Sequence, residues 1–186
     1  NSSFSEVWWF YPSASSSEND RYVIFNYEQK IWYYGNLGRT AWMDRGVDEF
    51  PIAAGSDHYL YDHESGLDDG STAPASAISA NIESSQLDLG DGDRFVFLSR
   101  LIPDITFRDS TANTPTATFT LGVRNFPGGK YLETDAGVVD KVASTPVEQF
   151  TKEVRTRLRG RSFNLKVEST ATETTWRLGT SRVEVR

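Results

Sequence analysis

The two histidines of the chain lie among carboxylates and aromatic residues, and such side chains supply metal ligands and catalytic acids and bases. His58 and His63 are five residues apart, so on an extended strand their rings point to opposite faces. They therefore do not converge on one metal ion, and His63-Glu64 is not part of a helical H-E-x-x-H motif. We expect His58 to flank a strand, His63 to lie at a polar turn, and no metal site.

Asp57, Asp62 and Glu64 are candidates for the paired carboxylates of a glycoside hydrolase, since aromatic residues that stack on sugars lie beside them. Acidic residues are abundant in this chain, however, and spacing along the chain does not place two carboxyl groups across a ligand. Residues 55–58 (Gly-Ser-Asp-His) resemble part of a triad only superficially, and neither a G-x-S-x-G elbow nor a glycine-rich phosphate loop occurs. The sequence therefore favours a protein that is not an enzyme, with no catalytic residue and no cofactor.

The segment 88–93 (Asp-Leu-Gly-Asp-Gly-Asp) has the composition of a calcium-binding loop. It lacks the D-x-D-x-D-G spacing, and no glutamate stands where the twelfth ligand would fall. Glycine and aspartate form tight turns without a metal, here and at 68–70. We therefore expect turns at both places, with a cation site at 88–93 as the weaker alternative.

Four of the five tryptophans, Trp8, Trp9, Trp32 and Trp42, lie in the first 64 residues. They could form a stacking platform for sugars or nucleic-acid bases. The favoured interpretation is packing in the core of a small sheet or between domains. Because Trp8 and Trp9 are adjacent, they point to opposite faces of a strand, and we expect at least one of them to meet another blade or another subunit. Trp8, Trp9 and Trp42 are therefore candidate interaction residues.

Charge is unevenly distributed along the chain, whose net charge is −7. Residues 44–93 carry twelve acidic side chains and one basic one, whereas residues 155–186 carry eight basic and three acidic ones. On a strand, Arg155, Arg157 and Arg159 share one face, either solvated or paired with acids of a neighbouring strand. A second interpretation is that the opposite charges guide contact between subunits. Direct reading of DNA is least favoured, because the chain is acidic overall.

The elements that position these residues are expected to be β-strands, because aromatics make up 13% of the chain and Thr, Val and Ile are frequent. Apolar side chains occupy the odd positions of 117–123 and of 163–167, which predicts strands with one buried face. This alternation shifts phase near Gly160 and near Gly179, where we expect a β-bulge or interrupted pairing. A Thr-Pro-Val-Glu helix start at 145–148 predicts at most a helical turn over 146–150.

The chain divides by composition into three segments. Residues 1–65 hold expected strands at 8–11, 21–27, 31–35 and 59–61, which match the scale of one four-stranded propeller blade. Residues 66–79 form a linker rich in small residues, and residues 80–186 supply six to eight strands, enough for a β-sandwich. The predicted fold is thus all-β, a terminal blade of a propeller followed by a β-sandwich.

Other classes of protein are excluded by composition and length. The chain has 186 residues and no cysteine, so disulfide scaffolds, cysteine zinc sites and thiol catalysis are ruled out. No apolar run approaches the length of a membrane-spanning helix. The chain begins at Asn1, without a methionine or a signal segment, and we interpret it as a piece of a longer protein.

A series of short segments is familiar when read in order along the chain. These segments are VWWFYPS (7–13), NDRYVIFNY (19–27), RTAW (39–42), PIAAGS (51–56), LYDHE (60–64), IES (82–84), GDGD (90–93), IPD (102–104), RLRGR (157–161) and WRLG (176–179). Together they resemble the C-terminal part of a family of virion structural proteins of tailed phages and prophages, the head-to-tail stabilisation or tail nozzle proteins of short-tailed phages. The resemblance covers nearly the whole chain.

The resemblance implies a propeller-containing subunit that forms a ring around the DNA exit channel. It implies contacts with other copies of the subunit, with neighbouring virion proteins and transiently with duplex DNA, and it carries no catalytic residues. The protein would be made in the bacterial cytoplasm and reside in the phage tail. An acidic channel wall would let DNA slide, because it repels the phosphates. The alternative is a carbohydrate- or receptor-binding module of a tail appendage, which uses the aromatic residues.

Overall fold

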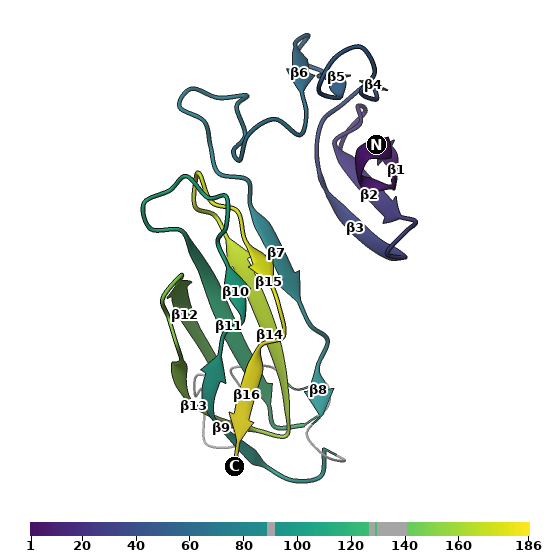
Figure 1. Ribbon diagram of the computed structural model, residues 1–186. Coiled ribbons are helices and arrows are strands. Elements are labelled where there is room, and N and C mark those ends of the chain that lie inside the picture. Colours follow the sequence, from purple (N-terminus) through teal and green to yellow (C-terminus); the bar gives the residue numbers. More distant parts are fainter. Residues whose placement is uncertain (89–91, 127–128, 130–140) are drawn as a thin grey trace. The chain divides into compact units, whose positions relative to one another are not determined.

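The computed structural model describes residues 1–88, 92–126, 129 and 141–186 (Figure 1). The chain forms two compact units, Asn1–Gly66 and Leu67–Arg186. Within the described ranges the regular structure is antiparallel β-strand, apart from a short 3-10 turn at Ser2–Phe4, and no sheets close into a propeller. The expectation of an all-β protein is confirmed.

The first sheet of the first unit is the predicted hairpin extended by one strand. Its order is β1-β2-β3, and its strands are β1 (Glu6–Tyr11), β2 (Arg21–Asn26) and β3 (Ile31–Asn36). Asn26 forms the hairpin turn, because its side-chain oxygen accepts hydrogen bonds from the amides of Glu28 (3.1 Å) and Gln29 (2.8 Å). Lys30 completes the turn with a left-handed φ of 59°.

The second sheet of the first unit corrects the expectation of a single four-stranded blade. It has the order β4-β5-β6, and its strands are β4 (Ala41–Met43), β5 (Ile52–Ala54) and β6 (Leu60–Asp62). The strand expected at 59–61 therefore joins this sheet instead of the first one. The reason is β5, a three-residue strand too short to give an alternation pattern, which pairs with both of its neighbours.

The second unit contains three sheets (Figure 1). The largest has the order β12-β11-β14-β7, with β8 also paired to β14; a second has the order β13-β9-β16; and β10 pairs with β15. The strands are β7 (Ala80–Glu83), β8 (Leu87–Asp88), β9 (Val96–Ile102), β10 (Ile105–Thr106), β11 (Thr116–Arg124), β12 (Val142–Glu148), β13 (Val154–Gly160), β14 (Ser162–Ser169), β15 (Arg177–Leu178) and β16 (Arg182–Val185).

One hydrophobic core holds the second unit together. Both larger sheets contribute to it, and its members are Leu98, Leu101, Phe107, Ala117, Phe119, Leu121, Val123, Val147, Val154, Leu158, Phe163 and Val167. The odd positions of β11 are buried, as the alternation in 117–123 predicted. Phe163 and Val167 of β14 are buried as well. Burial of these side chains supplies the main stabilisation of the unit.

The phase shift near Gly160 has a different cause from the predicted bulge. Strand β13 ends at Gly160 and β14 begins at Ser162, and the two strands belong to different sheets. A Cβ atom on Gly160 would lie 2.7 Å from Cβ of Val123 and 2.8 Å from the carbonyl oxygen of Arg124, so glycine is required where the chain crosses. The shift near Gly179 likewise separates β15 and β16, which lie in different sheets.

The predicted helical turn at 146–150 is wrong for its first three residues, which belong to strand β12. This strand lies at the edge of its sheet, where Pro146 removes no hydrogen bond from a central ladder. Val147 faces the core and is fully buried, so the strand alternation outweighs the helix-start signal. A hydrogen-bonded turn follows, in which the amide of Thr151 donates to the carbonyl of Glu148 (3.0 Å).

Candidate interaction surfaces

His63 takes part in a network of side chains at the second sheet of the first unit. Its Nε2 accepts a hydrogen bond from Nε of Arg39 (2.9 Å), and its ring lies 4.6 Å from the ring of Trp42. The Arg39 guanidinium also lies over the Tyr61 ring at 4.2 Å. His58 is separate from this network, in the turn between β5 and β6, with a φ of 71°. Across the described part of the chain, no three His, Asp or Glu side chains are grouped as a metal site would require.

The three carboxylates considered for glycoside hydrolysis have different surroundings. Asp57 accepts a short hydrogen bond from the Tyr61 hydroxyl, and this bond lowers the pKa of Asp57. Glu64 accepts a hydrogen bond from the Asn1 side chain (3.1 Å), and burial raises the pKa of Glu64. Asp62 is exposed at the end of β6. Two of these groups therefore have partners of their own, which is the arrangement of structural side chains.

Lowering the pH from 6.5 to about 4 is expected to destabilise the first unit through His63. Burial of the ring, with the Arg39 charge beside it, lowers the pKa of His63 from 6.5 to about 4. The unfolded chain takes up a proton at higher pH than the folded one. The stability that His63 confers is therefore complete above pH 6.5 and is lost progressively as the pH falls to about 4. Urea midpoints followed by tryptophan fluorescence over this range measure the loss.

Two variants separate His63 from the other titrating groups. His63→Gln keeps an acceptor for Arg39 but has no imidazole, so its midpoint is expected to change less over this range of pH. His58→Asn removes the exposed histidine, tolerates the left-handed backbone, and is expected to keep the slope of the parent. Equal slopes for the parent and His63→Gln would contradict the role of His63.

The loops predicted as turns lie in the second unit. Residues 89–91 of the candidate calcium segment lie outside the described residues; Gly92 has a φ of 71°, and Asp93 lies 3.9 Å from Arg94. At 68–70, Asp69 pairs with Ser76 in an isolated bridge. Both carboxylate oxygens of Asp68 lie within hydrogen-bond distance (2.8 and 2.9 Å) of the amide of Glu173. Part of the expected linker 66–79 is thus attached to the second unit.

Trp8 and Trp42 connect the two sheets of the first unit. Their rings are stacked 5.0 Å apart, and Phe10 lies 5.9 Å from Trp42. The indole N–H of Trp8 donates to Glu6 (2.9 Å), so this partly buried ring has its polar group satisfied. These two tryptophans pack within the unit, which is the interpretation that the sequence favoured for them.

The opposite side of the first sheet carries a patch that we call the aromatic face. The register of β1, β2 and β3 brings its members together: Val7, Trp9, Tyr11, Val23, Phe25, Trp32 and Tyr34. Trp9 is 48% exposed, Trp32 63% and Tyr34 87%. The Trp9 and Trp32 rings lie 5.9 Å apart at an angle of 26°, and Phe25 lies 4.7 Å from Trp32. Trp9 and Trp8 thus point to opposite sides of the strand, as expected.

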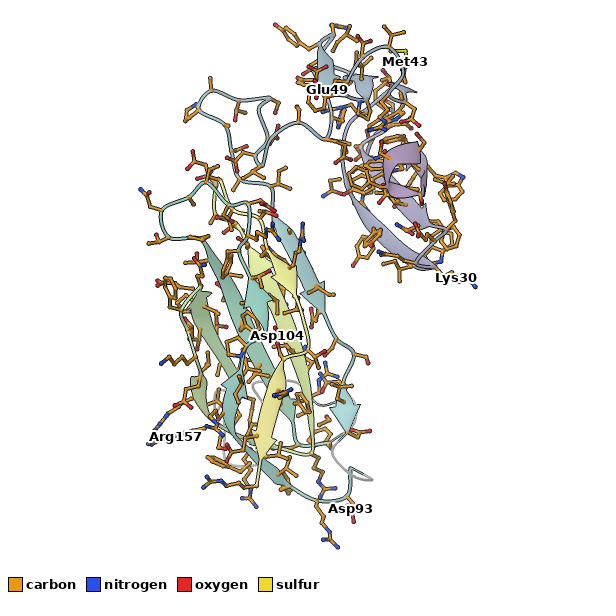
Figure 2. All side chains as sticks on the ribbon, in the orientation of Figure 1. Lys30, Met43, Glu49, Asp93, Asp104 and Arg157 are labelled. Carbon is orange, nitrogen blue, oxygen red and sulfur yellow. The ribbon has the colours of Figure 1, made fainter. Side chains whose placement is uncertain are left out.

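The candidate arginines lie on β13, the edge strand of its sheet. Arg155, Arg157 and Arg159 are exposed, and they alternate with the buried Val154, Thr156, Leu158 and Gly160. Arg157 points away from the unit (Figure 2), and among the described residues it has no hydrogen-bond or ion-pair partner. Arg157 and Arg159, together with Arg161 and Phe95, form what we call the arginine cluster. The guanidiniums of Arg159 and Arg161 lie 5.0 and 4.9 Å from the centre of the Phe95 ring.

A ladder of ion pairs lies beside this cluster, and it joins the three strands of the sheet. Arg100 of β9 pairs with Glu153 (3.1 Å) and with Glu184 of β16 (2.8 Å). Arg155 also pairs with Glu153 (3.0 Å), and Arg186 pairs with Glu184 (3.2 Å). The pairs of Arg100 are partly buried, whereas Arg155 and Arg186 are exposed. An exposed pair contributes little stability alone. Arg155 therefore belongs to the ladder, whereas Arg157 and Arg159 lie beyond it.

Sequence reasoning missed Phe95, Tyr34 and Arg39. Phe95 meets Arg159 and Arg161 because β9 pairs with β13, and this long-range pairing has no local signal. Tyr34 could have been found from the hairpin register, which places it beside Val23 on the side of Trp9. Arg39 has no pattern that would connect it with His63.

Comparison with known proteins found no relative of this chain: it matched no protein-family model and no curated protein. None of the described helical residues forms a segment long and apolar enough to cross a membrane.

Proposed function

We propose that the chain is a non-enzymatic structural subunit of a phage virion, at the tail nozzle or head-to-tail connector around the DNA exit channel. In this proposal the first unit is part of a propeller and the second unit is a β-sandwich. The subunit is made in the bacterial cytoplasm and assembles into the tail with other copies and with neighbouring virion proteins. The resemblance of the short segments to tail nozzle proteins supports the location in the virion. The exposed apolar side chains of the first unit support assembly with other subunits.

The observation that carries the proposal is the uncovered aromatic face. In residues 1–66, all of which the structure describes, the buried residues are Ile24, Asn26, Pro51, Ala53 and Gly55. Thirteen large hydrophobic side chains of the same residues are exposed: Phe4, Val7, Trp9, Tyr11, Tyr27, Ile31, Trp32, Tyr33, Tyr34, Met43, Val47, Tyr59 and Leu60. Five of these side chains, Val7, Trp9, Tyr11, Trp32 and Tyr34, share the aromatic face. An exposed, contiguous apolar patch of this kind marks a surface for another protein or ligand.

The second unit provides the contrast within the same chain. Its twelve core residues are buried against one another, so this unit, unlike the first, has a sizeable hydrophobic core of its own. The first unit has two three-stranded sheets, each with two open edge strands. Open edges and an uncovered aromatic face are stable where neighbouring subunits cover them. In the proposed ring, neighbouring subunits cover these edges and this face.

The acidic side chains of the first unit fit a channel through which DNA slides. Asp48, Glu49, Asp57 and Asp62 are exposed, and duplex phosphates are repelled by such a surface. In the assembled ring these four residues are expected to face the channel. Their location on the outer surface of the ring would contradict this part of the proposal.

Purified particles of the phage or prophage that encodes the chain test the proposed function. Mass spectrometry is expected to find the chain in several copies per particle, and cryo-electron microscopy is expected to locate it in a ring at the tail. Absence of the chain from purified particles, or its location only on a peripheral appendage, would overturn the proposal.

A carbohydrate-binding module is the second candidate function, and the Trp9–Trp32 pair favours it. The two rings are stacked, exposed and on one side of a sheet, which is a geometry that can receive the apolar face of a sugar ring. A glycan array probed with the chain distinguishes this function from assembly.

The variant Trp9→Ser/Trp32→Ser is expected to reduce the average mass of the protein in light scattering, because it removes two large apolar groups from the aromatic face. Its near-UV circular dichroism reports whether the remaining aromatic packing is retained. Tyr27→Ser is the matched control, since Tyr27 is an exposed aromatic residue in the turn after β2, outside the aromatic face. A variant that loses glycan binding without a change in mass would favour the carbohydrate module.

A further inference from the structure

We infer that the arginine cluster of one copy of the chain binds the acidic end of the first unit of a second copy. We define the acidic end as the residues that gather at one end of the β4-β5-β6 sheet: Asp44, Asp48, Glu49, Asp62 and Glu64. The contact is head to tail, because two different surfaces of the chain meet. This inference rests on the proposed function only in supposing that the chain associates with itself. It places Asp48, Glu49 and Asp62 in the contact between copies, as the alternative to the channel-facing position proposed for them above, and leaves Asp57 to the channel.

The topology of the first unit brings the acidic residues together. The loop 44–51 joins the end of β4 to the start of β5, and residues 62–64 follow the end of the antiparallel β6. The amide of His63 donates to the carbonyl of Pro51 (2.8 Å), which fixes these two segments side by side. Figure 2 shows Glu49 near this sheet. Carboxylates separated by up to 20 residues in the sequence therefore share one surface.

Most of this charge is not neutralised within the unit. Asp48 and Glu49 are exposed and, among the described residues, have no hydrogen-bond or ion-pair partner. Asp44 accepts a hydrogen bond from the amide of Ser2 (2.9 Å) and lies 4.0 Å from the N-terminal amine, and Arg45 is the one basic side chain of the two segments. A surface with several uncompensated carboxylates attracts a basic partner.

The arginine cluster has the composition of a protein interface. Arginine and aromatic residues are enriched where proteins bind one another, and a guanidinium pairs with a carboxylate through two parallel hydrogen bonds. The guanidiniums of Arg159 and Arg161 both lie over the Phe95 ring, which places an apolar ring among the charges. Phe97 is the cross-strand partner of Arg159 and is exposed beside it. The cluster thus offers both positive charge and apolar contact.

A second copy is the partner that these observations favour, because the chain carries both complementary surfaces. The acidic region 44–93 and the basic region 155–186 have opposite net charges, and a contact between unlike surfaces repeats from copy to copy. Repeated head-to-tail contacts close into rings when the rotation per subunit allows it. Duplex DNA would have to approach a chain of net charge −7, which disfavours it as the partner.

Sedimentation velocity of the whole 186-residue chain tests the contact. Association is expected at about 50 mM salt and is expected to weaken at about 500 mM, where charges are screened within a few ångströms. The variant Arg157→Glu/Arg159→Glu is expected to raise the dissociation constant about tenfold or more, because like charges then face each other. Arg108→Glu is the control, since Arg108 is an exposed arginine in the loop after β10, outside the cluster.

A charge exchange between two chains decides whether the contact joins different copies. Asp48→Lys/Glu49→Lys is also expected to weaken association by about tenfold. Mixing this variant with Arg157→Glu/Arg159→Glu is expected to restore mixed oligomers, since each reversed surface then meets an opposite charge on the other chain. Far-UV circular dichroism of both variants, compared with that of the parent, verifies that they are folded.

Four results would overturn the inference, and the last of them leaves the proposed function intact. The first is a parent chain that remains monomeric at low salt. The second combines two observations: a chain that carries both reversals regains its folding stability, and the two separate variants do not associate when mixed. The contact would then lie within a single copy. The third is unchanged association of the arginine variant together with loss of duplex DNA binding, which makes nucleic acid the partner. A ring in the particle with contacts insensitive to these reversals would leave the proposed function intact and contradict this inference alone.

Discussion

Replacing Phe119 with alanine is expected to unfold the second unit under conditions in which the first unit keeps its fold. Phe119 is 1% exposed and lies on β11, between Thr145 of β12 and Val167 of β14. Truncation of a buried phenylalanine leaves a cavity and costs about 3–5 kcal/mol. This is a large share of the roughly 5–15 kcal/mol that stabilises a typical domain.

Denaturation of the variant can be followed separately in the two units. Trp176 is the single tryptophan of the second unit and packs against its core, whereas the other four belong to the first unit. Tryptophan emission therefore reports mainly on the first unit, and the amide signals of β11 and β14 in a ¹H–¹⁵N spectrum report on the second.

Phe150→Ala is the matched control, since Phe150 belongs to the same unit and is 86% exposed. Its expected cost is below about 0.5 kcal/mol, as for most surface substitutions. Equal costs for the two substitutions would contradict a single core between the sheets.

Local patterns in the sequence predicted the strands that have a clear alternation or a clear turn. The alternation in 117–123 identified the buried side of β11, and the hairpin at 21–35 was predicted from two apolar runs around a polar turn. Both signals involve residues within a few positions of each other. The opposite orientation of Trp8 and Trp9 follows from the same local geometry.

Assignment of strands to sheets could not be predicted, because it depends on pairing between distant residues. Strands β13 and β14 are separated by Arg161 alone and still lie in different sheets. The alternation of apolar side chains shifts phase in the same way when the chain passes from one sheet to another as when a strand contains a bulge. The helix-start signal at Thr145 failed for a related reason, since Pro146 is acceptable only because β12 lies at an edge.

The roles of the candidate interaction residues also depended on distant partners. Trp8 is covered because Trp42 comes from another sheet, whereas Trp9 on the other side has no such partner from the second sheet. Arg155 pairs with the nearby Glu153, but Arg159 meets Phe95, which precedes β9 and lies far earlier in the sequence. Composition identified the types of residue that make such contacts. Only the pairing of distant strands determined which of these residues are covered and which are exposed.

Replacing Trp42 with alanine is expected to unfold the first unit, whereas Trp32→Ala is expected to leave it folded. Trp42 contacts Trp8, Phe10 and His63, with ring centres 5.0, 5.9 and 4.6 Å away, and so connects the two sheets. Its loss costs about 3–5 kcal/mol. Units of this size bury little surface and have a small margin of stability, so a loss of that size exceeds what the unit can tolerate.

The comparison between these two tryptophans tests the division of the first unit into an interior and an aromatic face. Trp32 contacts Phe25 and Trp9 on the exposed side, and its removal is expected to cost about 1 kcal/mol. Amide signals of β1, β2 and β3 in a ¹H–¹⁵N spectrum are expected to collapse in Trp42→Ala and to persist in Trp32→Ala. The core signals of the second unit serve as an internal control in both variants.

A folded Trp42→Ala variant would mean that the sheets do not depend on this stack. Loss of fold in Trp32→Ala would mean that the aromatic face stabilises the unit itself, which would remove the reason to assign that face to a partner.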